Sequence, residues 1–245
     1  MSAIPVGAPV PAVPRGAPLY PRAAFYYLLA TVGAVAAFVP SYFSRLQEND
    51  AVRHAHGIVG FAWMLLLVTQ AFLMRSRKVA LHRRLGKAAY VLAPAFVISG
   101  LLIVRAMASG ATGFEQHFGA RLAWVDLLSV STFGTCVYMA IRDRRQVQLH
   151  ARWMTCTALL LLPPVFVRLE QALPFIHSFE QAMNVAFGLT ELIIVLLLVG
   201  DFRQGQRRLP YRALLAVTAA QQVGFVMLDG VPGWAAFAYS LGHLG

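Results

Sequence analysis

The sequence predicts an all-α membrane protein that crosses the bilayer seven times. Three observations support this: 58% of the 245 residues are hydrophobic, only 13% are charged, and the mean hydropathy is +0.62. The apolar residues gather in blocks of about 20, the length that a helix needs to cross a hydrocarbon core. Every backbone polar group in lipid must be hydrogen-bonded within its own segment, so each block is expected to be helical. The expected spans are 23–43, 54–74, 86–104, 122–141, 153–172, 181–200 and 211–229.

The N-terminal segment differs in composition from the rest of the chain. Residues 1–22, MSAIPVGAPVPAVPRGAPLYPR, are rich in Pro, Ala and Gly and have no apolar periodicity. Such a segment cannot bury enough apolar surface to offset the entropy lost on ordering, which predicts a disordered cytoplasmic tail. Residues 23–245 are expected to form a single transmembrane domain.

The basic residues predict the orientation of the chain in the membrane. The N-terminus and the second, fourth and sixth loops hold all but five of the 21 Lys and Arg residues. By the positive-inside rule, the N-terminus is cytoplasmic and the C-terminus non-cytoplasmic, in a multi-pass protein of the inner membrane. The formal net charge of +11 then reflects topology and affinity for anionic lipid head groups, and it does not favour nucleic-acid binding. The five exceptions are Arg45, Arg53, Arg105, Arg121 and Arg168.

An internal repeat divides the centre of the chain into two helical hairpins, at 54–104 and 117–172. HGIVGFAWMLLL, which starts at His56, and HFGARLAWVDLL, which starts at His117, share a histidine, an Ala-Trp pair and a Leu-Leu pair at equal offsets. The next helices begin with LHRRLG and LHARWM, which align His82 with His150. Copies of a hairpin keep their direction across the membrane. The repeat therefore predicts a duplicated four-helix core with a pseudo-twofold axis along the membrane normal.

The four histidines of the repeat form two pairs, one at each membrane face. His56 and His117 open helices at the non-cytoplasmic side, whereas His82 and His150 open helices at the cytoplasmic side. A pseudo-twofold axis brings equivalent helices together across the core. Two facing histidines can then supply both axial ligands of a haem iron, so each pair is a candidate haem b site.

Two arginines accompany the cytoplasmic histidines. Arg84 and Arg152 each follow a histidine by two residues and, as planar donors, are candidate partners for haem propionates. The alternative is that these histidines and arginines bind only water and lipid phosphates, as polar residues at a membrane surface often do.

The placement of these histidines on four consecutive helices resembles that of cytochrome b561 over residues 54–172. This resemblance implies a core that holds one haem b between its second and fourth helices and another between its third and fifth. The strings LHRRLG and LHARWM, followed by Arg168, are also similar to a broad group of uncharacterised bacterial membrane proteins with an H-x-R pattern at two helix starts. The second resemblance implies no activity.

Three carboxylates fall inside the expected spans, namely Asp126, Glu191 and Asp229. An ionised carboxylate in lipid is costly unless it is paired or hydrated, and Arg168 is expected at a similar depth. We expect these four residues to line a polar cavity that opens outward and accepts a proton, a quinone or another small molecule. A structural clamp between Arg168 and a carboxylate is the alternative.

These features favour membrane electron transfer through one or two bis-histidine haem b groups, with a quinone or another small molecule as redox partner. The protein would then be a possible transmembrane oxidoreductase. The second hypothesis is a non-redox carrier or scaffold without haem, whose intramembrane carboxylates bind a proton-coupled solute. The sequence has no GxGxxG after a strand, no P-loop, no HExxH and no nucleophile elbow, so the usual soluble enzyme classes have no support.

Overall fold

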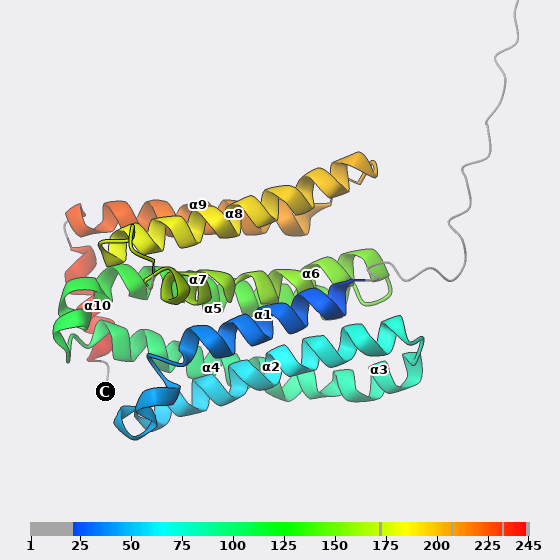
Figure 1. The fold of residues 1–245 in the computed structure, drawn as a ribbon, viewed down its shortest axis with the longest axis horizontal. Helices are drawn as coiled ribbons and strands as arrows, with labels where there is room; N and C mark the ends of the chain where they lie inside the picture. The colour runs from blue at the N-terminus through cyan, green and yellow to red at the C-terminus, as the bar shows by residue number, and fades with distance from the viewer. Residues whose placement is uncertain (1–21, 172, 207, 232, 244–245) are drawn as a thin grey trace, which may run out of the picture.

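Every regular element is helical in the computed structural model, which describes residues 22–171, 173–206, 208–231 and 233–243 (Figure 1). The predicted tail lies outside the described residues, apart from Arg22. Three short 3-10 turns, at Phe43–Glu48, Gly86–Ala88 and Leu228–Gly230, accompany the α-helices. The helices are α1 (Ala23–Phe38), α2 (Ala51–Arg75), α3 (Val79–Leu85), α4 (Ala89–Ala108), α5 (Gly113–Arg142), α6 (Val147–Leu159), α7 (Leu162–Glu170), α8 (Phe179–Arg203), α9 (Leu209–Met227) and α10 (Trp234–Gly242).

Six helical stretches are long and apolar enough to cross a membrane, which makes the chain a membrane protein. They correspond to the second through seventh predicted spans. The first predicted span is α1, whose 16 residues rise about 24 Å, less than the hydrocarbon core of about 30 Å. The count of seven spans and the orientation of the termini therefore stay predictions. The six stretches are Ala51–Arg75, Val79–Ala108, Gly113–Arg142, Val147–Glu170, Phe179–Arg203 and Leu209–Gly230.

The stretch Val147–Glu170 is broken in its middle, where α6 ends at Leu159 and α7 begins at Leu162. Pro163 and Pro164 follow the break and occupy the first turn of α7. Proline has no N–H to donate to the preceding turn, and its ring clashes with the carbonyl there, so a helix ends before it and can restart on it.

Six helices contact one another in a closed order when the consecutive helices α6 and α7 are taken as one unit: α1 with α2, α2 with α4, α4 with α5, α5 with α6, and α7 with α1. Helices α8 and α9 pack against each other and against α5, α6 and α7, on one side of this ring (Figure 1). Helix α10 packs on α4 and α5 at one end. The two predicted hairpins, α2 with α3 and α4, and α5 with α6 and α7, thus form adjacent parts of one bundle.

The centre of the bundle is held by aromatic packing and one buried hydrogen bond. Trp63 of α2 is completely buried, and its ring contacts Phe133 of α5 at a centroid distance of 4.9 Å. Its indole N–H donates to the hydroxyl of Thr157 on α6 at 3.1 Å. Helices α3 and α10 lie at opposite ends of the bundle in Figure 1. We call the end with α3 the His82 end and the opposite end the His56 end.

Candidate functional site

His82 and His150 lie side by side at the His82 end. His82 is on α3 and His150 is in the first turns of α6, so the chain reaches this point from both hairpins. The centroids of the two imidazole rings are 6.4 Å apart, and the ring planes are nearly perpendicular at 85°. The structure therefore brings the predicted cytoplasmic pair together.

Both rings of this pair are held through their Nδ1 atoms. His150 Nδ1 donates to the backbone carbonyl of Ala140 at 2.9 Å. The amide of Gln70 on α2 lies 2.5 Å from His82 Nδ1, and in the orientation that satisfies its neighbours it also contacts the His82 carbonyl and the N–H of Gly86. In that orientation the Gln70 amide nitrogen donates to His82 Nδ1 and the amide oxygen accepts from the Gly86 N–H, so Nδ1 is the unprotonated ring nitrogen of a neutral His82 and Nε2 carries the proton. These contacts orient both rings and leave Nε2 as the second nitrogen of each.

The separation of the two rings is the feature of this pair that can be compared with a haem site. Metal–imidazole bonds of roughly 2 Å place two rings on a common iron with centroids about 6 Å apart, close to the separation observed here. A histidine ligand usually donates its other ring N–H to a carbonyl or carboxylate, as His150 Nδ1 does here, whereas His82 Nδ1 accepts from the Gln70 amide. Within the described part of the chain, no group of three or more His, Cys, Asp and Glu side chains could hold a metal ion. Two protein ligands are sufficient for haem because the porphyrin supplies the other four.

The structure does not bring His56 and His117 together. His56 Nδ1 lies 3.1 Å from the hydroxyl of Ser99 on α4, and its ring packs against Phe96 at 4.8 Å. The side chain of His117 is 69% exposed, and its Nε2 lies 3.9 Å from a carboxylate oxygen of Glu180 on α8. The two histidines thus have different neighbours, and they do not form the predicted second pair.

Helix length explains this difference between the two ends. His56 lies 19 residues before the end of α2 at Arg75, whereas His117 lies 25 residues before the end of α5 at Arg142. Six additional residues at 1.5 Å each place His117 about 9 Å farther from the His82 end than His56. Because His82 and His150 lie at the same level at one end of the bundle, His117 and His56 lie at different levels at the other end.

The two arginines predicted to bind propionates have different environments. Arg84 is exposed at the His82 end. Arg152 is only 2% exposed and forms a two-pronged ion pair with Asp201 of α8, at 2.8 Å from Nε and 2.5 Å from Nη2. Its Nη1 donates to the Gln148 side chain at 2.6 Å. Arg152 therefore already has a carboxylate partner, and Arg84 is the arginine of the two that faces solvent.

A cavity of about 1300 Å³ opens at the His56 end, and Asp126, Arg168 and His56 all line it. Glu191 and Asp229, the other two residues of the predicted cavity, are elsewhere. Glu191 of α8 interacts with Thr218 of α9, and Asp229 is exposed in the 3-10 turn after α9. The structure thus assembles a cavity from two of the four predicted residues and adds His56.

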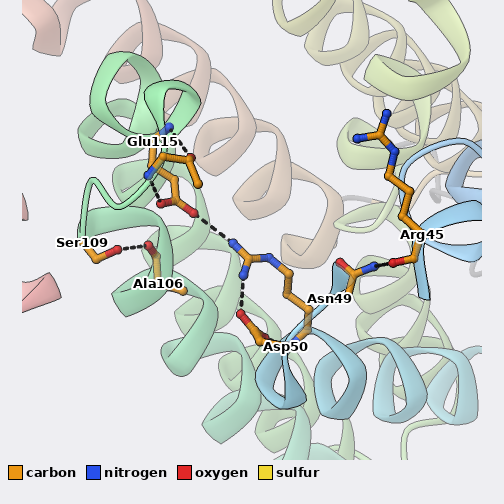
Figure 2. Close-up of polar contacts among 8 residues, drawn as sticks. Arg45, Asn49, Asp50, Ala106, Ser109 and Glu115 are labelled. Carbon is orange, nitrogen blue, oxygen red and sulfur yellow. Dashed lines mark hydrogen bonds and ion pairs between the residues drawn. The ribbon is translucent and has the colours of Figure 1, made fainter. Parts of the chain in front are cut away.

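The rim of this cavity includes a charged network that sequence reasoning did not identify. The carboxylate of Asp50 caps the start of α2 by accepting from the Arg53 N–H at 2.8 Å. The Arg53 guanidinium pairs with Asp50 and reaches Glu115 of α5 at 2.9 Å (Figure 2). Glu115 and Thr112 form a reciprocal capping box at the start of α5. The network joins the starts of α2 and α5 and neutralises the charge of Arg53. The Thr-x-x-Glu spacing of Thr112 and Glu115 was the sequence signal for its capping box.

No protein-family model, no curated protein and no solved structure matches the chain.

Proposed function

We propose that the protein is a membrane electron carrier that holds one b-type haem between His82 and His150. The single observation that carries this proposal is the pairing of the two rings, 6.4 Å apart, with both Nδ1 atoms engaged. When bound, the haem would supply one-electron chemistry. A second haem is not proposed, because His56 and His117 have separate partners.

The protein's own contribution is to position and tune the two ligands. The Ala140 carbonyl accepts from His150 Nδ1, which fixes that tautomer and makes Nε2 the metal-binding nitrogen. His82 Nδ1 accepts from the Gln70 amide nitrogen in this structure, so iron binding at His82 Nε2 would require the Gln70 amide to turn and its oxygen to accept from Nδ1–H. Arg84 is the proposed partner of a propionate. The proposed electron partner is a quinone or another small redox molecule, and the distribution of basic residues predicts that this end faces the cytoplasm.

The test is the reduced-minus-oxidised absorbance spectrum of full-length protein purified from haem-replete cells. We expect a b-type spectrum that is lost in His82→Ala and in His150→Ala. His56→Ala, which removes a histidine of the opposite end, serves as the matched control and is expected to keep the spectrum. Gln70→Leu is expected to retain the haem but shift its midpoint potential, since only the orientation and basicity of His82 change.

A wild-type preparation without a b-type spectrum contradicts the proposal. So does a spectrum that survives both His82→Ala and His150→Ala, because the paired rings would then have no part in binding.

A further inference from the structure

The cavity at the His56 end is large, mostly apolar and independent of the histidine pair at the other end. Its volume of about 1300 Å³ exceeds the roughly 300–1,000 Å³ of ordinary small-molecule sites. Its walls come from α1, α2 and every helix from α4 to α9, and they include aromatic side chains such as Phe61, Phe118 and Phe133. A cavity of this kind favours an elongated apolar ligand.

The lining of the cavity is elongated along the helices and is longest on α5, where it runs from Phe114 to Phe133, about 28 Å. The lining also runs along α2 from Arg53 to Met64 and along α4 from Phe96 to Met107. At 1.5 Å per residue, each run rises about 16 Å. Half of a hydrocarbon core is about 15 Å thick, so an extended acyl chain fits beside the helices.

Arg168 places a guanidinium in the wall of the cavity. Its Nε donates to the Ser41 hydroxyl at 3.2 Å and its Nη1 to the Pro164 carbonyl at 2.7 Å, and the group lies 4.1 Å above the ring of Phe38. These contacts fix the guanidinium without neutralising it. Across the described ranges, Nη2 makes no hydrogen bond and no carboxylate lies within 4.0 Å of the group.

Asp126 is the opposite charge in the same cavity. It is close enough to Arg168 for their charges to interact, but the two do not form an ion pair within 4.0 Å. Arg53, the other cation of the lining, is already paired with Asp50 and Glu115. The cavity therefore offers a cation and an anion, unpaired and separated, in apolar surroundings where separated charges are unfavourable.

We propose that this cavity binds a long-chain carboxylic acid in its neutral form. The carboxyl C=O accepts from Arg168, the carboxyl O–H donates to Asp126, and the acyl chain lies along α2 and α4. A neutral carboxyl group hydrogen-bonds to both charged side chains and adds no charge of its own. A carboxylate anion would be repelled by the Asp126 carboxylate. An ester has no O–H to donate to Asp126. The proposal does not depend on haem binding.

The test on the wild-type protein is a titration with cis-parinaric acid, a fluorescent fatty acid, in lipid nanodiscs. We expect saturable binding that palmitic acid displaces. Methyl palmitate has the same chain but no hydrogen to donate, so it should compete at least about tenfold less well. Absence of saturable binding, or equal competition by the acid and its methyl ester, overturns the proposal.

Variants test the two anchors separately. Arg168→Gln and Asp126→Asn should each weaken parinarate binding by about tenfold or more. Arg45→Gln, which changes an exposed arginine near the same end, should bind as the wild type does. Ala34→Phe, which fills the α1 wall and leaves both charges in place, should also reduce binding. Unchanged parinarate binding in both anchor variants contradicts the proposal. If an anchor variant fails to fold, the competition between palmitic acid and methyl palmitate on the wild-type protein still tests the proposal.

Discussion

Arg152 and Asp201 form a buried, two-pronged ion pair that joins α6 to α8, with Nη2–Oδ1 at 2.5 Å and Nε–Oδ2 at 2.8 Å. Arg152 is two residues after His150, so the pair holds the start of α6 against a helix outside the repeat. Both side chains are at most 9% exposed, which leaves either partner without water if the other is removed.

The first prediction concerns this pair. Arg152→Met or Asp201→Leu alone should destabilise the protein by about 3–5 kcal/mol, because each leaves an uncompensated buried charge. The double variant should recover much of that loss, since apolar residues then replace both charges. Thermal unfolding in detergent measures the effect. Arg203→Gln, at an exposed arginine near the same end of α8, is the control and should change stability by less than about 1 kcal/mol. A double variant whose loss of stability equals the sum of the two single losses would contradict the pairing.

The second prediction concerns the contact between α4 and α5. A Cβ on Gly119 would lie 2.2 Å from the backbone carbonyl oxygen of Met107, a distance that backbone cannot relieve without moving a helix. Gly119→Ala should therefore lower the unfolding temperature. Gly188→Ala in α8 is the control, since no atom lies within 4 Å of its added Cβ, and alanine should stabilise it by up to about 1 kcal/mol. Equal behaviour of the two variants would contradict the packing.

The third prediction concerns pH. The hydrogen bond from the Arg53 N–H, reinforced by the Arg53 guanidinium, holds the pKa of Asp50 below its usual value. A carboxyl with a lower pKa in the folded state contributes stability above its unfolded pKa of about 4, and that contribution is lost as the pH falls through the folded pKa. Asp50→Asn should thus be less stable than wild type at pH 7, and the difference should shrink below about pH 4. Glu48→Gln, at an exposed carboxylate nearby, is the control. A stability difference between wild type and Asp50→Asn that grows as the pH falls would contradict the lowered pKa of Asp50.

The fourth prediction concerns membrane orientation. In a background with Cys136→Ala and Cys156→Ala, a single cysteine at Arg145→Cys in the α5–α6 loop should resist a membrane-impermeant maleimide in intact bacterial cells. Asn49→Cys in the α1–α2 loop should react, because the positive-inside rule places these loops on opposite faces. An N-terminal tag should be inaccessible from the side of Asn49 if the chain has seven spans, because α1 then separates the two, whereas six spans would leave them on the same side. The inverse labelling pattern would contradict the orientation.

Composition was sufficient to predict the helices, because about 20 consecutive apolar residues in lipid leave the backbone no other regular structure than a helix. The break before Pro163 was not predicted, although the Pro163-Pro164 pair was its signal. Likewise, α1 ends at Phe38, earlier than the predicted 43, so its length alone does not establish a span.

The site was predictable in part. The pairing of His82 with His150 followed from the repeat, because both follow the loop of a hairpin. The separation of His56 from His117 also has a cause in the sequence, because α5 continues for six more residues after His117 than α2 does after His56. The partner of Arg152 could not be predicted, because Asp201 belongs to a helix outside the repeat whose position depends on packing.

The most direct test of the central claim is the ratio of haem to protein in purified wild type. If only the rings at the His82 end share an iron, we expect one b-type haem per chain. This haem should be unchanged in His56→Ala and absent in His82→Ala and His150→Ala. Two haems per chain, none, or one that is lost on removal of His56 alone would contradict this account.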